Sequence, residues 1–415
     1  MPDFKMKLLQ AREARWAFFS AQKQSFITFN LNIPGYPKTS PQIKTIFERV
    51  AAELGIFLEL VFELKNYHRG QDEAGLYLYI PCPYPDLKLV KNILDEFERT
   101  HPSGRLLDID VYNHQLDRIT NNRFKKCFLC ERQAQICIRN KNHTLSEVRA
   151  TCEKQLASCL NQDLLAQKAY LALIKEASVD PKPGLVTRKS HHCHPDMDFF
   201  LLVKSALALR PGFAQMAKAE NLAQIREVGL QMEQAMYQAT NGINTHKGLI
   251  FLMGIAVCAV KYPDVSQAIK NICKNITQEL QPNLKTHGAQ IYQKYGFAGA
   301  RGEAENGMPL VLQTGFKALT KYQKHLKNDD DVYTAVLTEI IARNNDTNLL
   351  YRGGLEKLKT VQKMALNIIN QGFWSKAARL KYQELCTYCQ KHNLSCGGAA
   401  DMLALTIFFD KINLH

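Results

Sequence analysis

The stretch Gly104-Arg-Leu-Leu-Asp-Ile-Asp-Val111 decides how the first part of this chain folds. It follows the turn signal Pro102-Ser103-Gly104, and its second half alternates between polar and apolar residues, which predicts a β-strand. Side chains two residues apart share one face of a strand, so Asp108 and Asp110 are expected to project together. Two such carboxylates can hold Mg²⁺, but the same alternation also describes an exposed polar face opposite a buried apolar one.

The sequence on either side of this strand divides the chain into two parts of different character. A second strand is predicted at 76–80 and a helix at 42–54, so the first part is α+β. The capping-box pattern Thr144-Leu-Ser-Glu147 then opens a region whose periodicity is mostly helical to the C-terminus. We therefore predict an α+β domain over 1–150 and an all-α domain over 160–415.

A basic segment that carries cysteines follows the strand. Residues 117–141 are rich in lysine and arginine, which suits a polyphosphate or an acidic protein surface, although most charged runs are simply solvated. The same segment offers side chains of the types that bind zinc, namely Cys127, Cys130, Cys137 and His143. Their spacing is short for a common zinc module, so buried thiols without a metal are the alternative.

Three runs in this part, GRLLDIDV at 104–111, RFKKCFLC at 123–130 and AQICIRNKNH at 134–143, resemble the apo-citrate lyase phosphoribosyl-dephospho-CoA transferase family. The resemblance implies a nucleotidyltransferase-like domain. A serine of the citrate lyase acyl carrier protein would attack the α-phosphate of 2′-(5″-triphosphoribosyl)-3′-dephospho-CoA, and pyrophosphate would leave. It further implies Mg²⁺ on Asp108 and Asp110. The triphosphate would be held by Arg105, Arg123, Lys125 and Lys126.

Five polar loops interrupt the helical part. Their sequences are PKPGLVTR at 181–188 followed by HPDMD at 194–198, NTHKG at 244–248, GARGEAE at 299–305, DTN at 346–348 with RGG at 352–354, and SCGGAAD at 395–401. Each loop alone is typical of a helix cap or a turn. Together they combine cations, carboxylates and glycines that permit a ligand to approach the backbone, which favours a phosphate-binding site.

In this order, the five loops are similar to those of triphosphoribosyl-dephospho-CoA synthases, from about Leu164 to the C-terminus. The similarity implies a reaction between ATP and 3′-dephospho-CoA. The ribose 2′-hydroxyl of dephospho-CoA would attack C1 of the ATP ribose, and adenine would leave with the triphosphate kept intact. Two residues depart from the family pattern: Thr187 stands where aspartate is expected, and Cys396 where proline is expected.

Such a reaction needs a base, a cationic and metal-bearing pocket, and carboxylates beside an oxocarbenium-like ribose. We assign metal binding or the role of base to Asp196 and Asp198, and contact with the ribose to Glu303 or Glu305. Mg²⁺ is expected here as well. Phosphate and nucleotide binding is expected of the other polar residues of the loops, which are Lys182, Arg188, His194, His246, Lys247, Arg301, Asp346, Asn348, Arg352 and Asp401.

The composition of the 415-residue chain fits a two-domain cytoplasmic enzyme. Its formal net charge of +14 attracts polyanions without choosing among nucleic acid, nucleotides and acidic proteins. The longest apolar run, Leu249–Val260, is well short of the ~20 residues that cross a bilayer, so a buried helix is predicted there. No nucleic-acid-binding signature or secretory signal is recognisable, and we expect neither nucleic acid nor membrane as a partner.

Three other functions remain open on these observations. The same chemistry could serve a malonate decarboxylase carrier subunit instead of the citrate lyase carrier. A basic nucleic-acid-binding protein could use residues 117–141. A helical ADP-ribose or nucleoside hydrolase could use the five loops, with water in place of dephospho-CoA.

Overall fold

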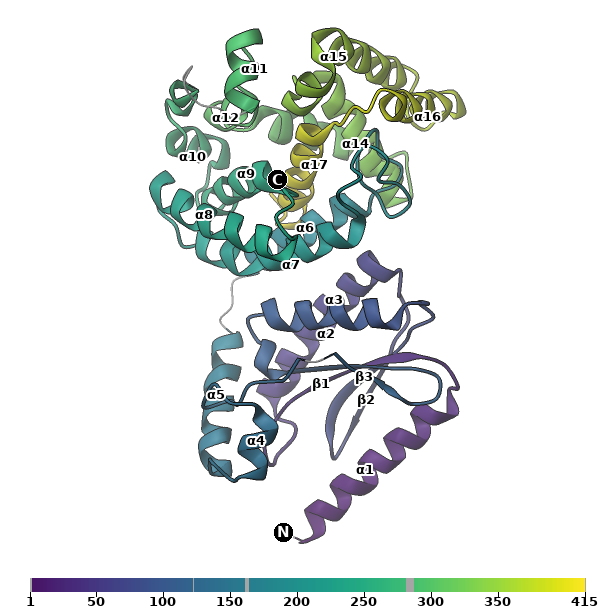
Figure 1. Cartoon of the computed structure of the whole chain (residues 1–415), viewed down its shortest axis with the longest axis vertical. Coiled ribbons are helices and arrows are strands. Elements are labelled where there is room, and N and C mark those ends of the chain that lie inside the picture. Colours follow the sequence, from purple (N-terminus) through teal and green to yellow (C-terminus); the bar gives the residue numbers. More distant parts are fainter. Residues whose placement is uncertain (1, 122, 161–163, 281–286, 415) are drawn as a thin grey trace. The chain divides into compact units, whose positions relative to one another are not determined.

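The computed structural model describes residues 2–121, 123–160, 164–280 and 287–414. The chain divides into two compact units, Met1–Asp163 and Leu164–His415. Every strand of the described residues lies in the first unit, and the second is helical (Figure 1). The prediction of an α+β region followed by a helical one is therefore confirmed.

The first unit is built on one antiparallel sheet with the strand order β2-β3-β1-β4-β5. The central strand, β1, pairs with both β3 and β4, so that Phe29 lies between Leu78 and Ile109. The strands predicted at 76–80 and within 104–111 are confirmed as β3 and β4. The bounds are β1 Phe26–Leu31, β2 His68–Asp72, β3 Gly75–Pro81, β4 Leu107–Tyr112 and β5 Arg118–Ile119.

Helices cover both faces of this sheet, with α2 and α3 on one side and α1 on the other (Figure 1). The side under α2 and α3 is the apolar core, where the rings of Phe29 and Phe47 stack with centroids 5.0 Å apart. On the other side, Arg15 of α1 donates to Asn30 Oδ1 over 2.8 Å. The bounds are α1 Pro2–Ala21, α2 Pro41–Phe62 and α3 Leu87–Thr100, so the helix predicted at 42–54 is confirmed and extends further.

The helix that opens with the capping box belongs to the first unit. In α5 (Leu145–Leu160) the Thr144 amide donates to Glu147 Oε2 over 2.8 Å, and the Glu147 amide donates to Thr144 Oγ1 over 3.3 Å. This helix packs against α2, where Arg49 donates to the carbonyl of Cys159 over 3.0 Å. The short helix α4 (Ala134–Arg139) precedes it.

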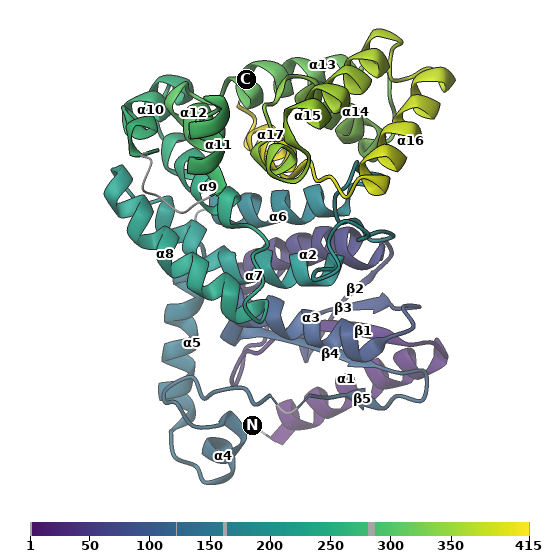
Figure 2. The same cartoon turned by 45° about the horizontal axis from the view of Figure 1, so that its top comes forward.

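A buried helix, α17, lies at the centre of the second unit and packs against α6, α9 and α14 (Figure 2). The apolar run from Leu249 falls in α9, and its side chains are buried nearly all round, so the predicted core helix is confirmed. None of the described helices is both long and apolar enough to cross a membrane. The main bounds are α6 Leu165–Ser178, α7 Phe199–Met216, α8 Leu222–Ala239, α9 Lys247–Ala259, α10 Val265–Ile272, α11 His287–Tyr295, α12 Gly299–Glu305, α13 Phe316–Gln323, α14 Asp329–Arg343, α15 Thr347–Asn370, α16 Lys376–Lys391 and α17 Gly397–Lys411.

Candidate active sites

The two aspartates of β4 lie on the same face of the sheet and are both partly exposed. Residues at odd positions of this strand are buried, whereas Asp108 and Asp110 alternate with them. Each aspartate has a cation beside it, because Lys125 Nζ lies 2.8 Å from Asp108 Oδ1 and Arg118 Nη2 lies 2.6 Å from Asp110 Oδ1. The strand thus presents two carboxylates together, each neutralised by a side chain from the basic segment.

Side chains replace a neighbouring strand along the outer edge of β4. Among the described residues, β5 pairs only with Val111 and Tyr112, so the backbone at Leu107 and Ile109 has no strand partner there on that side. Lys91 and Lys125 donate to the Ile109 and Leu107 carbonyls over 2.8 and 2.9 Å. The Ile109 amide donates to Glu98 Oε1 over 2.6 Å. These bonds satisfy backbone groups that are costly to leave unpaired.

Glu98 and Lys91 were not predicted from the sequence. Both come from α3, where positions 91, 95 and 98 share one face of the helix, and this spacing was the available signal. Burial raises the pKa of Glu98 to about 7, although Lys125 and Lys91 favour its ionised form. A carboxyl group that exchanges protons near neutral pH therefore lies beside the aspartate pair.

Arg105 has unused hydrogen-bonding capacity at this site. Its Nε and Nη1 atoms are buried and have no hydrogen-bond partner among the described residues, and its guanidinium lies 4.0 Å from the centre of the Phe128 ring. Buried donors are normally paired, and a phosphate is a natural bidentate partner for a guanidinium. Two other predicted phosphate ligands, Arg123 and Lys126, form ion pairs with Glu96 and Glu131.

The five polar loops of the second unit meet at one cavity of about 310 Å³. Nine of the residues predicted for this site line it, and they come from every loop: Lys182, His194, His246, Lys247, Glu303, Asp346, Asn348, Arg352 and Asp401. These residues span more than half of the chain, so only the fold brings them together.

Hydrogen bonds tie three of the loops to one another. His194 Nε2 lies 3.0 Å from Ser395 Oγ, and Arg352 donates to the Cys193 carbonyl over 2.8 Å. At Gly184, where φ is +65°, a Cβ atom would lie 2.0 Å from the Leu394 carbonyl oxygen. The first and last loops therefore meet at a contact that only glycine permits.

Replacing Gly184 with alanine should destabilise the second unit by about 2–5 kcal/mol, because overpacking adds to the strain of a left-handed backbone. Gly242→Ala is the matched control, since φ is +86° there and nothing lies within 4 Å of the added Cβ. The control should lose only about 1–2 kcal/mol. Denaturant unfolding measures both variants, and equal losses would contradict the close-contact explanation.

Buried carboxylates give the cavity an acidic side. Asp346 caps α15 and accepts hydrogen bonds from the amides of Asn348 and Ala399, both over 2.9 Å. Burial still raises the pKa of Asp346 to about 6. Burial, together with the neighbouring Asp346, also raises the pKa of Asp401. A Cβ on Gly248 would lie 2.9 Å from Asp401 Oδ2, so this carboxylate approaches the start of α9 closely.

Glu303 and Glu176 add two further carboxylates to the lining. Burial raises the pKa of Glu303 to about 7, and its Oε2 accepts from the Leu310 amide over 3.2 Å. Glu176 forms a buried ion pair with Lys182 at 2.6 Å. Glu176 was not predicted, and the only signal for it was an acidic residue within the largely apolar helix at 165–178.

His246 is a neutral, fixed part of the wall. It is buried, and its Nδ1 lies 2.7 Å from Ser205 Oγ. Burial, with a smaller contribution from Lys182, lowers the pKa of His246 to about 4. The imidazole therefore stays uncharged at neutral pH and offers hydrogen bonds to a ligand.

Five of the predicted residues do not line the cavity. Asp196 is exposed, and Asp198 caps α7 by accepting from the Leu201 amide over 2.7 Å, which is the helix-cap alternative for this carboxylate. Glu305 instead accepts from Thr277 Oγ1 over 2.5 Å. The remaining two are cations, with Arg188 over the Phe199 ring and Arg301 Nε 3.9 Å from Glu279 Oε2.

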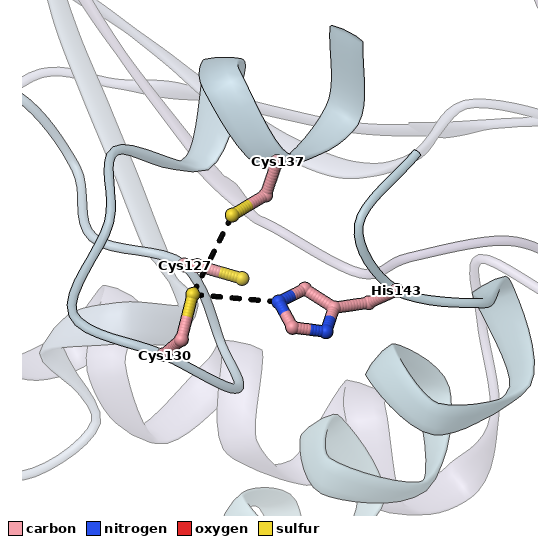
Figure 3. Close-up of side chains that lie close together, drawn as sticks. All are labelled: Cys127, Cys130, Cys137 and His143. Atoms are coloured by element: carbon pink, nitrogen blue, oxygen red, sulfur yellow. Dashed lines mark hydrogen bonds between the residues drawn. The ribbon is translucent and has the colours of Figure 1, made fainter. Parts of the chain in front are cut away.

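The predicted zinc ligands of the first unit do come together. The sulfur atoms of Cys127, Cys130 and Cys137 and a ring nitrogen of His143 all lie within 4.8 Å of one another (Figure 3).

Two family models match the chain, and the boundary between them lies within a few residues of the boundary between the two compact units. A family model described as apo-citrate lyase phosphoribosyl-dephospho-CoA transferase (CitX) matches residues 5–159, and one described as ATP:dephospho-CoA triphosphoribosyl transferase (CitG) matches residues 162–415. A Haemophilus influenzae protein named CitXG is 32% identical, over 97% of this chain and 95% of its own length. The chain belongs to the CitXG family.

Other relatives of this CitXG-family chain support the same family assignment. The CitXG protein of Leuconostoc mesenteroides subsp. cremoris is 31% identical, over 98% of this chain and 97% of its own length. A 2-(5″-triphosphoribosyl)-3′-dephosphocoenzyme-A synthase from Haemophilus ducreyi is 35% identical and covers 68% of this chain and 98% of its own length. Relatives therefore include both the fused protein and the separate synthase.

The two departures from the synthase pattern are both buried in this CitXG-family chain. The Thr187 hydroxyl accepts from the amides of Lys189 and Ser190 over 3.2 and 3.1 Å, which closes a local turn. Cys396 stands immediately before α17. Neither residue lines the cavity, so both act on the shape of their loops.

The donors in this CitXG-family cavity suit a hard divalent cation. Four carboxylates line it, and burial raises the pKa of three of them, those of Glu303, Asp346 and Asp401. Buried negative charge is costly unless a cation or hydrogen bonds compensate it. Oxygen ligands of this kind are the ones that Mg²⁺ prefers.

Proposed function

We infer that this chain is a bifunctional transferase that makes the prosthetic group of citrate lyase and attaches it to the acyl carrier protein. The second unit joins ATP and 3′-dephospho-CoA with release of adenine. The first unit transfers the product to a serine of the carrier with release of pyrophosphate. One observation carries this inference furthest: five loops spread over the second unit's sequence converge on a single acidic and cationic cavity.

In the second unit we assign the role of base to Glu303. It would take the proton of the dephospho-CoA 2′-hydroxyl as the new bond to C1 of the ATP ribose forms and the bond from C1 to adenine breaks. A base works best when its pKa is near the working pH, and burial holds that of Glu303 at about 7. Lys247 and Arg352, which line the cavity, would bind phosphates.

Asp346 and Asp401 would hold Mg²⁺ in this cavity. When bound, the ion neutralises charge on the triphosphate. We prefer this pair to Asp196 and Asp198, whose side chains do not line the cavity.

In the first unit we propose nucleotidyltransferase-type chemistry on β4. Asp108 and Asp110 would hold Mg²⁺, while the Arg105 donors that have no partner among the described residues would bind a phosphate of the incoming triphosphate. The serine oxygen attacks the α-phosphorus, and the bond to pyrophosphate breaks. Lys125 forms an ion pair with Asp108 in this structure. Its ammonium group would stabilise the negative charge that develops on the phosphates during the reaction.

Residues 123–145 offer a surface for the carrier protein. Three apolar side chains, Phe124, Ile138 and Leu145, are 63%, 77% and 62% exposed, and they are interspersed with exposed basic residues. Exposed apolar side chains in a basic setting fit a partner with an acidic surface. The CitX description names citrate lyase, so a malonate decarboxylase carrier and a nucleic acid are not favoured.

Charge reversal on this surface tests whether the carrier protein binds there. We expect Arg139→Glu to raise the KM for the apo-carrier about 10-fold, with little change in kcat, because rim charges act mainly on encounter. Lys65→Glu, at an exposed lysine of the same unit that lies outside 123–145, is the control. An equal KM in the two variants would exclude this surface.

The combined reaction tests the function itself. The full chain is incubated with ATP, 3′-dephospho-CoA, Mg²⁺ and apo-carrier protein. Adenine is measured by chromatography and the carrier by mass spectrometry. We expect stoichiometric adenine and a mass gain equal to the phosphoribosyl-dephospho-CoA group on the citrate lyase carrier. Release of ribose triphosphate into solution would identify a hydrolase, and absence of both products would refute the proposal.

A further inference from the structure

One cluster in the first unit takes no part in either proposed reaction. It consists of Cys127, Cys130, Cys137 and His143, whose side chains converge from a loop, from α4 and from a position two residues before α5 (Figure 3). The Cys130 and Cys137 sulfurs are 3.5 Å apart, and His143 Nε2 is 3.4 Å from Cys130 Sγ.

These separations suit four ligands around one ion. Tetrahedral zinc with sulfur ligands at 2.3 Å keeps its ligand atoms about 3.8 Å apart. A disulfide would require about 2.05 Å between the sulfurs, which is much shorter than the 3.5 Å found. Thiolate and imidazole ligands favour zinc over magnesium, which prefers oxygen.

The surroundings of the sulfurs are those of ligand thiolates. The Leu129 amide donates to Cys127 Sγ over 3.5 Å, and Asn142 Nδ2 donates to Cys137 Sγ over 3.8 Å. Such donors stabilise negative charge on a ligand atom and hold its orientation. The Cys127 amide donates in turn to the Arg132 carbonyl over 2.7 Å, which closes the loop that carries the first two cysteines.

The segment around the cluster has almost no apolar core of its own. Among the described residues of 117–144, only Cys137 is buried. The helix α4 has 6 residues, too few to be stable alone. Small segments that lack a core are usually held by disulfides or by a metal. An ion at the cluster would supply the stabilisation that burial does not.

We propose that Cys127, Cys130, Cys137 and His143 bind a structural zinc ion that holds the basic segment in place beside β4. The segment contributes Lys125, which contacts Asp108, and Phe128, which lies under Arg105. The effect on activity rests on the proposed function of the first unit, whereas the binding of zinc does not. Zinc loss should therefore impair attachment and leave adenine release intact.

The test uses the full chain, purified with added zinc, and measures bound metal by mass spectrometry. We expect one zinc per chain in the unmodified protein and in Cys152→Ala, the control at a buried thiol of the same unit outside the cluster. Cys130→Ser and His143→Ala should lose the metal, whereas His143→Cys should keep it. Cobalt in place of zinc should give the visible absorption of a tetrahedral thiolate site.

Activity measurements on the zinc-free variant show whether the bound zinc is needed for attachment. Cys130→Ser should slow attachment of ready-made intermediate by about 10- to 100-fold while adenine release stays unchanged. An unmodified protein that holds neither zinc nor cobalt, or that carries a Cys130–Cys137 disulfide instead, would overturn the site. Zinc loss without any effect on attachment would overturn its role, and the proposed function would stand.

Discussion

Replacing Glu303 with glutamine should slow adenine release by about 10²- to 10⁴-fold, the usual contribution of a general base. The amide keeps the size of the side chain and its contact with the Leu310 amide, but it cannot accept a proton. Attachment of ready-made intermediate to the carrier should proceed at the normal rate, because the first unit is unchanged. Single-turnover release of adenine measures the effect.

Glu305→Gln is the matched control, because Glu305 lies two residues away, does not line the cavity and accepts from Thr277. It should keep nearly full activity. Equal losses in the two variants would exclude a specific role for Glu303.

The pH dependence of adenine release gives a second test of the same base. Burial raises the pKa of Glu303 to about 7, so the carboxyl is protonated and inactive below that value. The rate of the unmodified protein should rise with pH through about 7 and then level off. The residual rate of Glu303→Gln should lack this step. A wild-type profile that is flat between pH 5 and 8 would contradict the assignment.

Replacing Asp110 with asparagine should slow attachment to the carrier by about 10²- to 10³-fold, comparable with the loss of one preorganised electrostatic contact. The asparagine is isosteric but removes the charge that would hold Mg²⁺ and that now faces Arg118. Adenine release should be unaffected. Mass spectrometry of the carrier, with ready-made intermediate as substrate, measures the change.

Asp117→Asn is the control for this variant, since Asp117 is an exposed aspartate of the same unit that hydrogen-bonds with Asn113 within its own turn. A further experiment joins the two main variants. Mixing Glu303→Gln with Asp110→Asn should restore modification of the carrier, because each chain supplies the active unit that the other lacks. Failure of the mixture, with each single reaction intact, would show that intermediate does not pass between chains.

Local sequence patterns were sufficient to predict much of the structure of the first unit. The alternation at 107–111 predicted both the strand and the common face of Asp108 and Asp110, because a strand repeats every two residues. It did not reveal Glu98 or Lys91. Those side chains bond the backbone of Ile109 in β4, which the short strand β5 leaves without a strand partner among the described residues.

In the second unit, the five loops were recognisable from their sequences. Which residues of each loop line the cavity could not be predicted. Asp196 and Asp198 were predicted as metal ligands, and neither lines the cavity, since Asp198 caps α7 and Asp196 is exposed. Glu176 looked like an ordinary helical residue and proved to line the cavity. Spacing along the chain does not say which way a loop side chain points, whereas helix packing does.

The sequence by itself determined the division into an α+β part and a helical part, the buried helix at Leu249, the strand with its two aspartates, and the family. These follow from periodicity and motifs, which are local. Tertiary structure alone decided which polar residues share the cavity and the pKa of Glu303, since both depend on burial and on neighbours far away in the chain. It also decided that three thiols and an imidazole lie within reach of one ion.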